Sequence, residues 1–411
     1  MSMTKHFHQG ARVFVAGLTS ESSMLREELV LNPERAAGVE FTSVQLSGVD
    51  QTDYLRIHPE SKTCSFFMTP GVRKGLLDRR TALYPLDYMG IARHLEESVP
   101  YDISIGQFTS PDSQGWCHPG LSVDFLPIVW KRAKRRVAHL NPALPRIESS
   151  FRLHVSELDN AVEATYPPLS IQFPSPDEVT DRIGRHASSL IRDGDTLQFG
   201  IGAIAHAVAR SLVGHRRLRV LSGMVAPWLR TLWENGAIDR DARIMTGVLF
   251  GDANFYEFAE SLDRVFLDDV RATHDMRAIS KVPQFVAINS AVEIDLLGQV
   301  NSERTDGTLH AGAGGLPAYA QASLLSREGR LLICLPSTAR SGTISRIVTS
   351  LDSTSMCTLP RHLSDFVVTE YGVAELRGMS IARRAEALIA IAAPQHREHL
   401  YSTWDQMRVR L

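Results

Sequence analysis

Short apolar runs alternate with amphipathic, helix-like segments along most of this chain. The clearest unit begins with an apolar run at residues 196–199, turns through the glycines of residues 200–202 and enters a helical pattern. In that helix Ile204, Val208 and Leu212 recur every four positions, which places them on one face. A strand that ends in glycines before a helix presents backbone N–H groups and the positive end of the helix dipole. Such a turn suits a phosphate, a carboxylate or a developing oxyanion.

The same alternation predicts the rest of the fold. Further strand-like runs lie at residues 13–17, 39–46, 82–84, 102–107, 137–140, 151–155, 219–221, 244–250, 285–288, 331–335 and 366–369. Further helical patterns lie at residues 177–191, 226–235, 317–325 and 381–391. Short buried strands that alternate with helices are typical of a mostly parallel sheet covered on both faces. We therefore expect an α/β fold.

A proline-rich stretch divides the chain. At 411 residues the protein is too long for one ordinary core. Four prolines fall within residues 166–176, directly before a helical pattern. We predict an N-terminal α/β domain at residues 1–172 and a C-terminal α/β domain at residues 173–411. Gly10 and Gly194 each introduce a strand–glycine–helix unit, which indicates two related halves.

Composition narrows the classes of function. The chain is 44% hydrophobic and 22% charged, with a net charge of −2, so its overall charge gives no reason to expect nucleic acid as a partner. No apolar run is long enough to cross a membrane. Cys64, Cys117, Cys334 and Cys357 are scattered, without a C-x-x-C pair or a secretory signal. We expect reduced thiols and a cytoplasmic location.

A second glycine cluster also precedes a helix and could present backbone N–H donors in the same way. Residues 310–315 read His-Ala-Gly-Ala-Gly-Gly and precede a helix with Pro317 in its first turn. Glycine in a single turn often serves only to reverse the chain. Two such loops in one predicted domain favour a role in holding a ligand.

Several segments together resemble the class I coenzyme A transferases, in the acetyl-CoA hydrolase/transferase group that includes 4-hydroxybutyrate and butyrate:acetate CoA-transferases. They keep the family's order and cover almost all of the chain. The segments are SPDSQGWC (110–117), HVSELD (154–159), GDTLQFGIG (194–202), INSAVEIDLLGQVNSE (288–303), GAGG (312–315), LPSTA (335–339) and VTEYGVAELRG (368–378).

The resemblance implies two related open α/β domains with mostly parallel sheets, and an active-site cleft between them. It implies coenzyme A and acyl-CoA as substrates with an acyl or CoA acceptor, no permanently bound cofactor, no metal, and a homodimer or homotetramer. In the family's mechanism a glutamate attacks the acyl-CoA thioester and gives a mixed anhydride. The CoA thiolate then forms a glutamyl-CoA thioester, from which a second carboxylate collects CoA. Backbone N–H groups of the glycine loops stabilise each oxyanion.

This chain lacks that glutamate. The family motif reads His or Tyr, Thr or Ser, Glu, then Met or Val. An ungapped count from Gly200 aligns it with Leu221, Ser222, Gly223 and Met224, so Gly223 stands at the glutamate position. We expect the absent side chain to leave room for a water or for part of a second substrate.

Two residues are candidates for the missing chemistry. His310 opens the second glycine loop and is a candidate general base, although a lone histidine more often serves structure. Ser222 is a candidate nucleophile, although no Gly-x-Ser-x-Gly elbow surrounds it. Glu293, Glu303 and Glu370 lie in shared motifs, where hydrogen bonding in sheets or turns is their expected role. The predicted contacts for the CoA thioester are Gly200, Ile201, Gly202, Ala203, Gly223, Asn289, Gly312, Gly314 and Gly315.

Three functions fit these residues. The first is an acyl-CoA-processing enzyme without a glutamyl-CoA intermediate, which hydrolyses the thioester or passes the acyl group directly to a bound acceptor. The second is a CoA-transferase that uses a displaced carboxylate. The third is a non-catalytic acyl-CoA-binding protein. The residues name neither the acyl group nor the acceptor.

Overall fold

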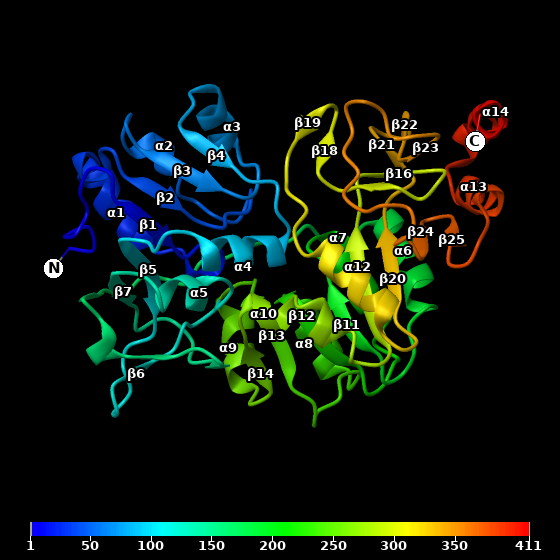
Figure 1. Ribbon diagram of the computed structural model, residues 1–411. Coiled ribbons are helices and arrows are strands. Elements are labelled where there is room, and N and C mark those ends of the chain that lie inside the picture. Colours follow the sequence, from blue (N-terminus) through cyan, green and yellow to red (C-terminus); the bar gives the residue numbers. More distant parts are fainter. Residues whose placement is uncertain (1, 411) are drawn as a thin grey trace. The chain divides into compact units, whose positions relative to one another are not determined.

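The computed structural model describes residues 2–410 and divides them into two compact units (Figure 1). The first unit contains the residues up to Gln172 together with Arg243–Thr273 and His310–Gly312. The second contains Phe173–Ala242, His274–Leu309 and the residues from Ala313 onward. The predicted division after residue 172 differs from this grouping, because the segments Arg243–Thr273 and His310–Gly312 belong to the first unit. The assignment of two domains divided at residue 172 remains a prediction.

The first unit is built on a parallel sheet in the order β10-β7-β5-β1-β2-β3-β4. The strands are β1 (Arg12–Val15), β2 (Glu40–Thr42), β3 (Lys62–Ser65), β4 (Thr81–Leu83), β5 (Ile103–Phe108), β7 (Arg135–Leu140) and β10 (Asn160–Glu163). The helices are α1 (Ser23–Leu31), α2 (Tyr54–Ile57), α3 (Pro70–Leu77), α4 (Tyr88–Glu97) and α5 (Leu126–Trp130). Every residue of β5 is buried, as expected for a central strand with helices on both faces.

Further short elements belong to the same unit. Strands β13 (Ile244–Leu249), β14 (Val265–Leu267) and β8 (Glu148–Ser149) pair in parallel. Strands β6 (Trp116–Cys117) and β9 (Leu153–His154) pair antiparallel. Helices α9 (Ala253–Ser261) and α10 (Val270–Thr273) complete the segment that returns to this unit.

The second unit has a sheet in the order β25-β24-β20-β15-β11-β12, parallel except for the antiparallel pair β24–β25. The strands are β11 (Thr196–Phe199), β12 (Arg219–Val225), β15 (Phe285–Ser290), β20 (Arg330–Cys334), β24 (Phe366–Thr369) and β25 (Gly372–Glu375). The helices are α6 (Glu178–Ser188), α7 (Ala203–Ser211), α8 (Trp228–Glu234), α11 (Met276–Ile279), α12 (Leu316–Leu325), α13 (Ile381–Ala390) and α14 (Pro394–Arg408). Helices α7 and α12 both pack against β15, which is central.

Small antiparallel and parallel pairs follow β15 in this unit. They are β16 (Glu293–Asp295) with β17 (Val300–Asn301) and β23 (Ile347–Val348), β18 (Arg304–Thr305) with β19 (Thr308–Leu309), and β21 (Thr338–Ala339) with β22 (Ile344–Ser345). The α/β fold with mostly parallel sheets is thus confirmed. Within residues 2–410, no helix has both the length and the apolar composition that a membrane span requires.

Two predicted strands are shorter than expected. The run at residues 39–46 is paired in the sheet only as β2, up to Thr42, and the last residue of the run, Leu46, is bonded to the Asp50 carboxylate instead. Its two oxygens accept hydrogen bonds from the N–H groups of Leu18 and Leu46, each at 2.7 Å. The run at residues 151–155 forms only β9, since a 3-10 turn begins at Val155.

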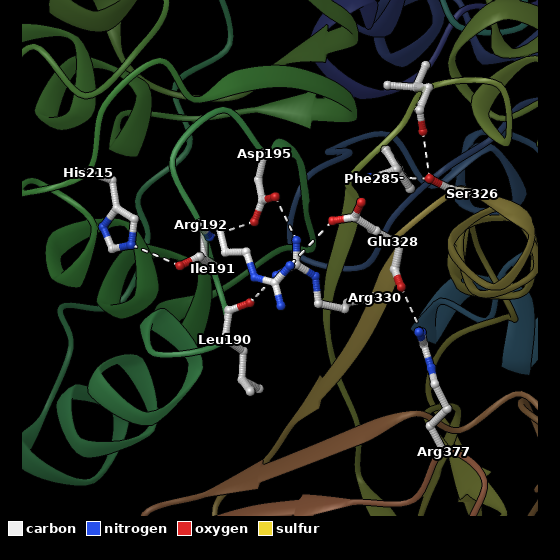
Figure 2. A network of polar contacts seen from close by, with 12 residues as sticks. Leu190, Ile191, Arg192, Asp195, His215, Phe285, Ser326, Glu328, Arg330 and Arg377 are labelled. Carbon is white, nitrogen blue, oxygen red and sulfur yellow. Dashed lines mark hydrogen bonds and ion pairs between the residues drawn. The ribbon is translucent and has the colours of Figure 1, made fainter.

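A buried ion pair fixes the second sheet at the start of β11 and β20 (Figure 2). Asp195 directly precedes β11, and Arg330 is the first residue of β20; their side chains meet at 2.6 Å, with Asp195 fully buried. Arg330 also donates to the carbonyl oxygen of Leu190 at 2.6 Å, and Asp195 accepts the N–H of Arg192 at 2.7 Å. The ion pair therefore holds β11 in register across β15, and β11 leads directly into the first glycine turn.

Candidate functional site

The first glycine turn joins β11 to α7 and is held by the sheet. The N–H of Gly200 donates to the carbonyl oxygen of Ile288 at 2.8 Å. Gly202 has φ +111°, while the place of its absent Cβ is open, so this position needs glycine for conformation and not for space. Ile201 is 46% exposed between the two glycines. The turn thus presents an apolar side chain beside the N-terminus of α7.

Both glycine loops lead to helices without a side-chain cap. The first N–H groups of a helix have no partner inside it. In the part of the chain that the structure describes, α1, α6 and α9 receive a side-chain cap from Ser22, Asp177 and Asp252. Helices α7 and α12 begin after Gly202 and Gly315 without a side-chain cap from the described residues, as do α5, α8 and α14. These two N-termini are therefore suited to an external anion or oxyanion.

Three neighbouring strands end at the same edge of the second sheet, and each contributes a predicted contact. Gly200 follows β11, Gly223 lies near the end of β12, and Asn289 lies near the end of β15. The Asn289 amide donates to Gln198 at 2.8 Å, and its Oδ1 lies 3.4 Å from where a Cβ on Gly200 would be. Ligands of open α/β sheets bind at the carboxyl ends of strands. The structure therefore brings these three residues together where a ligand is expected.

The space beside Gly223 is filled, which corrects the expectation of room for a water or substrate. A Cβ on Gly223 would lie 2.6 Å from Cε1 and 2.7 Å from Nε2 of His274. It would also lie 2.9 Å from the hydroxyl oxygen of Tyr319. A side chain at position 223 would therefore meet these two residues at its first carbon, so the glycine leaves no room there in this arrangement.

The same imidazole contacts the second glycine loop. A Cβ on Gly315 would lie 2.7 Å from Nε2 of His274 and 2.8 Å from Cε2 of Tyr319. His274 therefore packs against backbone of both β12, through Gly223, and the start of α12, through Gly315. One buried side chain thus lies against both the predicted glutamate position, Gly223, and the end of the second glycine loop, Gly315.

His274 and Tyr319 form a compact pair in the core of the second unit. Their ring centroids lie 4.8 Å apart, and the ring of Phe285 stacks on that of Tyr319 with 6.2 Å between the centroids. His274 is 3% exposed and Tyr319 is 2% exposed. Burial lowers the pKa of His274 to about 3, so its imidazole is neutral at physiological pH.

Ser222, the candidate nucleophile, faces away from Gly223 along the strand. Side chains alternate across a strand, and the Ser222 side chain is buried between β12 and β11. Its hydroxyl donates to the carbonyl oxygen of Phe199 and accepts from the N–H of Phe199, each at 3.3 Å. This placement supports a structural role for Ser222.

The residues of the second glycine loop fall in different units. His310, the candidate base, is exposed and groups with the first unit, as does Gly312. A Cβ on Gly312 would lie 2.8 Å from the carbonyl oxygen of Phe66, so backbone passes close there. Gly314 has φ +60° and groups with Gly315 in the second unit. The structure therefore does not bring His310 and Gly223 together within one unit.

The shared glutamates are engaged in loop structure. Glu370 accepts hydrogen bonds from the N–H and the hydroxyl of Ser337 at 2.8 and 2.6 Å. Glu303 accepts from Thr358 at 2.8 Å. Glu293 accepts from the amide of Asn301 at 2.9 Å. Among residues 2–410, no group of three or more His, Cys, Asp or Glu side chains is arranged to hold a metal ion.

Sequence reasoning missed His274 and Tyr319. Neither lies in a motif that the sequence singles out, and His274 is far along the chain from Gly223. The signal was indirect: a glycine inside a strand often marks a place where another group approaches closely.

Comparison with known proteins agrees with the resemblance. The profile of the acetyl-CoA hydrolase/transferase N-terminal domain matches residues 2–171, and that of the C-terminal domain matches residues 251–404. The chain is 33% identical over 403 residues to the 4-hydroxybutyrate coenzyme A transferase of Clostridium kluyveri, covering 96% of this chain and 94% of that protein. The chain belongs to the acetyl-CoA hydrolase/transferase family.

Solved structures show the same fold. The 4-hydroxybutyrate CoA-transferase of Porphyromonas gingivalis has a TM-score of 0.82 at 26% identity, over 100% of this chain and 97% of that one. RipA from Yersinia pestis has a TM-score of 0.90 at 24% identity, over 99% of this chain and 96% of that one. The two-domain α/β architecture expected for the family is therefore supported.

Proposed function

We propose that this protein processes acyl-CoA thioesters without a glutamyl-CoA intermediate, by hydrolysis or by direct transfer of the acyl group to a bound acceptor. Membership of the acetyl-CoA hydrolase/transferase family supports the thioester substrate. One observation supports a reaction without the glutamyl-CoA intermediate. Position 223 has no carboxylate, and a side chain there would meet His274 and Tyr319 at its first carbon.

Residues of this chain can supply the oxyanion donors and the base that direct attack on a thioester requires. In this proposal an acceptor attacks the thioester carbon, the C–S bond breaks, and the CoA sulfur leaves as thiolate. The developing oxyanion needs fixed donors, which the uncapped N-termini of α7 and α12 can supply. Ile201 and Asn289 would contact the substrate beside them. His310 remains the candidate base that takes the acceptor's proton.

The second candidate function is CoA transfer through a displaced carboxylate. The names of the transferase relatives favour it, and it requires an available carboxylate near the thioester. Glu293, Glu303 and Glu370 accept hydrogen bonds from their own loops, which makes each a poor nucleophile in this arrangement. This observation ranks direct acyl processing first. The third candidate is a protein that binds acyl-CoA without turnover.

Three measurements separate these functions. The protein is incubated with acetyl-, butyryl- and 4-hydroxybutyryl-CoA in the presence of water, acetate, an amine or an alcohol, and free thiol is titrated. Intact mass is recorded during turnover. Thiol release without a protein–CoA adduct supports the proposal. An adduct formed during turnover supports the displaced carboxylate and overturns it. Calorimetric binding of CoA without any release supports the binding protein.

The setting of the reaction is part of the same proposal. We expect a homodimer or homotetramer in the cytoplasm. The four free cysteines, three of them buried, fit a reducing compartment. Light scattering coupled to size-exclusion chromatography measures the oligomeric state directly.

A further inference from the structure

One buried side chain excludes any side chain at two glycine positions. The distances of 2.6 and 2.7 Å from a Cβ on Gly223 to the imidazole of His274 are shorter than real Cβ contacts. The distance of 2.7 Å from a Cβ on Gly315 to Nε2 of His274 is equally short. Either the imidazole or a side chain at these positions can be present, but not both in this arrangement.

The imidazole and the ring beside it are both closed off from solvent. His274 is 3% exposed, and the Tyr319 ring beside it is 2% exposed. Tyr319 is in turn backed by Phe285, and both belong to a core cluster that includes Ile279 of α11. Interiors packed to this extent transmit a clash instead of absorbing it.

From this geometry we propose that His274 is the specificity-determining residue of the site, because it reserves position 223 for glycine and so closes the route through an enzyme-bound carboxylate. The inference rests on the proposed function and deepens it, since it names the residue responsible for the changed reaction. Tyr319 assists His274, because its hydroxyl oxygen would lie 2.9 Å from the same Cβ.

The proposal requires that a carboxylate at position 223 becomes reactive once the imidazole is removed. A glutamate there would attack the thioester carbon; the C–S bond would break and CoA thiolate would leave. The thiolate would then attack the glutamyl carbonyl of the anhydride and release the acyl group as a carboxylate. The net result is a protein thioester of CoA and a free carboxylate, with no oxidant or further reactant.

The test compares three proteins: Gly223→Glu alone, Gly223→Glu with His274→Ala, and His274→Ala alone as the matched control. Each full-length protein is checked for folding by circular dichroism and is then incubated with butyryl-CoA. Intact mass and peptide mapping at position 223 report the CoA adduct. We expect an adduct on the introduced glutamate in the double variant and none at position 223 in either single variant.

Tyr319 provides a second variant if the double variant does not fold or if the hydroxyl still blocks the glutamate. The variant Gly223→Glu/His274→Ala/Tyr319→Phe removes both polar atoms that approach position 223. An adduct at position 223 in this protein but not in Gly223→Glu supports the proposal. A folded triple variant without an adduct overturns it, and so does an adduct on the introduced glutamate while His274 is intact.

The outcome is distinguishable from failure of the proposed function. The proposed function fails if the unchanged protein itself forms a CoA adduct during turnover, and peptide mapping then places that adduct outside position 223. The role of His274 is judged only from the adduct on the glutamate introduced at position 223. Both results are read from the same spectra.

Discussion

The imidazole of His274 lies 2.6 Å from the position that a Cβ on Gly223 would take, closer than side-chain carbons approach a neighbour. Through this contact His274, which lies two residues before α11, restricts which side chain strand β12 can carry at position 223. Position 223 lacks the side chain expected from the family motif, yet it is packed against His274. The change in the free energy of unfolding on substituting Gly223 should therefore depend on whether His274 is present.

A methyl group at position 223 is therefore expected to be much more costly while His274 is present than after its removal. Overpacking of a tight core costs about 1–3 kcal/mol, and we expect Gly223→Ala to lower the free energy of unfolding by this amount. In a His274→Ala background the added cost should largely disappear. Denaturant unfolding of the four proteins gives the coupling free energy.

Gly214→Ala is the matched control for this cycle. A Cβ on Gly214 would have nothing within 4 Å, so its substitution is expected to change stability by no more than about 0.5 kcal/mol in either background. If Gly223→Ala costs no more than Gly214→Ala, the imidazole does not hold the position that the distances indicate.

The buried imidazole also predicts a pH dependence of stability. Burial lowers the pKa of His274 to about 3 from its ordinary value of 6.5. Between these two values the unfolded chain binds a proton that the folded chain does not, so stability falls as pH drops below 6.5. One proton difference corresponds to about 1.4 kcal/mol per pH unit.

The variant His274→Asn removes this titration. We expect its free energy of unfolding to fall less steeply than that of the unchanged protein between pH 6 and pH 4.5. At pH 8, where the imidazole is neutral in both states, the difference between the proteins measures the native contacts that the substitution removes. Parallel pH curves would contradict a neutral, desolvated His274.

A substitution of Ser222, the residue before Gly223, distinguishes a structural role from a catalytic one. Its hydroxyl bonds only with the backbone of Phe199 among the contacts that the structure records, and it is fully buried. We expect Ser222→Ala to cost about 1 kcal/mol of stability and to reduce the rate of thiol release less than tenfold. A loss of about a thousandfold at unchanged stability would instead identify Ser222 as the nucleophile.

Much of the fold could be predicted from the sequence, because strands of a buried parallel sheet consist of short runs of apolar residues. The runs expected at 102–107, 196–199 and 331–335 correspond to β5, β11 and β20 within one residue at either end. Helix α14 was not predicted, because only Leu400 and Trp404 of its residues are buried and no continuous apolar stripe marks it.

The site was only partly predictable for a different physical reason. Glycine at 202 is required by a positive φ, which is a local property that a turn pattern can indicate. Glycine at 223 is required by the approach of His274, which is a tertiary contact. A sequence read alone cannot tell whether an absent side chain leaves a space or makes way for a neighbour.

The ion pair between Asp195 and Arg330 carries the last prediction. Removing one partner of a buried pair leaves an uncompensated charge and typically costs about 3–5 kcal/mol, which we expect for Arg330→Met. The double variant Asp195→Leu/Arg330→Met should cost less than Arg330→Met alone, since no buried charge remains. Arg192→Met is the control, because Arg192 pairs with Glu328 at the surface, where such pairs contribute about 0–1 kcal/mol (Figure 2). Urea unfolding measures all three. A cost for Arg330→Met no greater than that for Arg192→Met would show that this pair does not hold β20 and β11 in register.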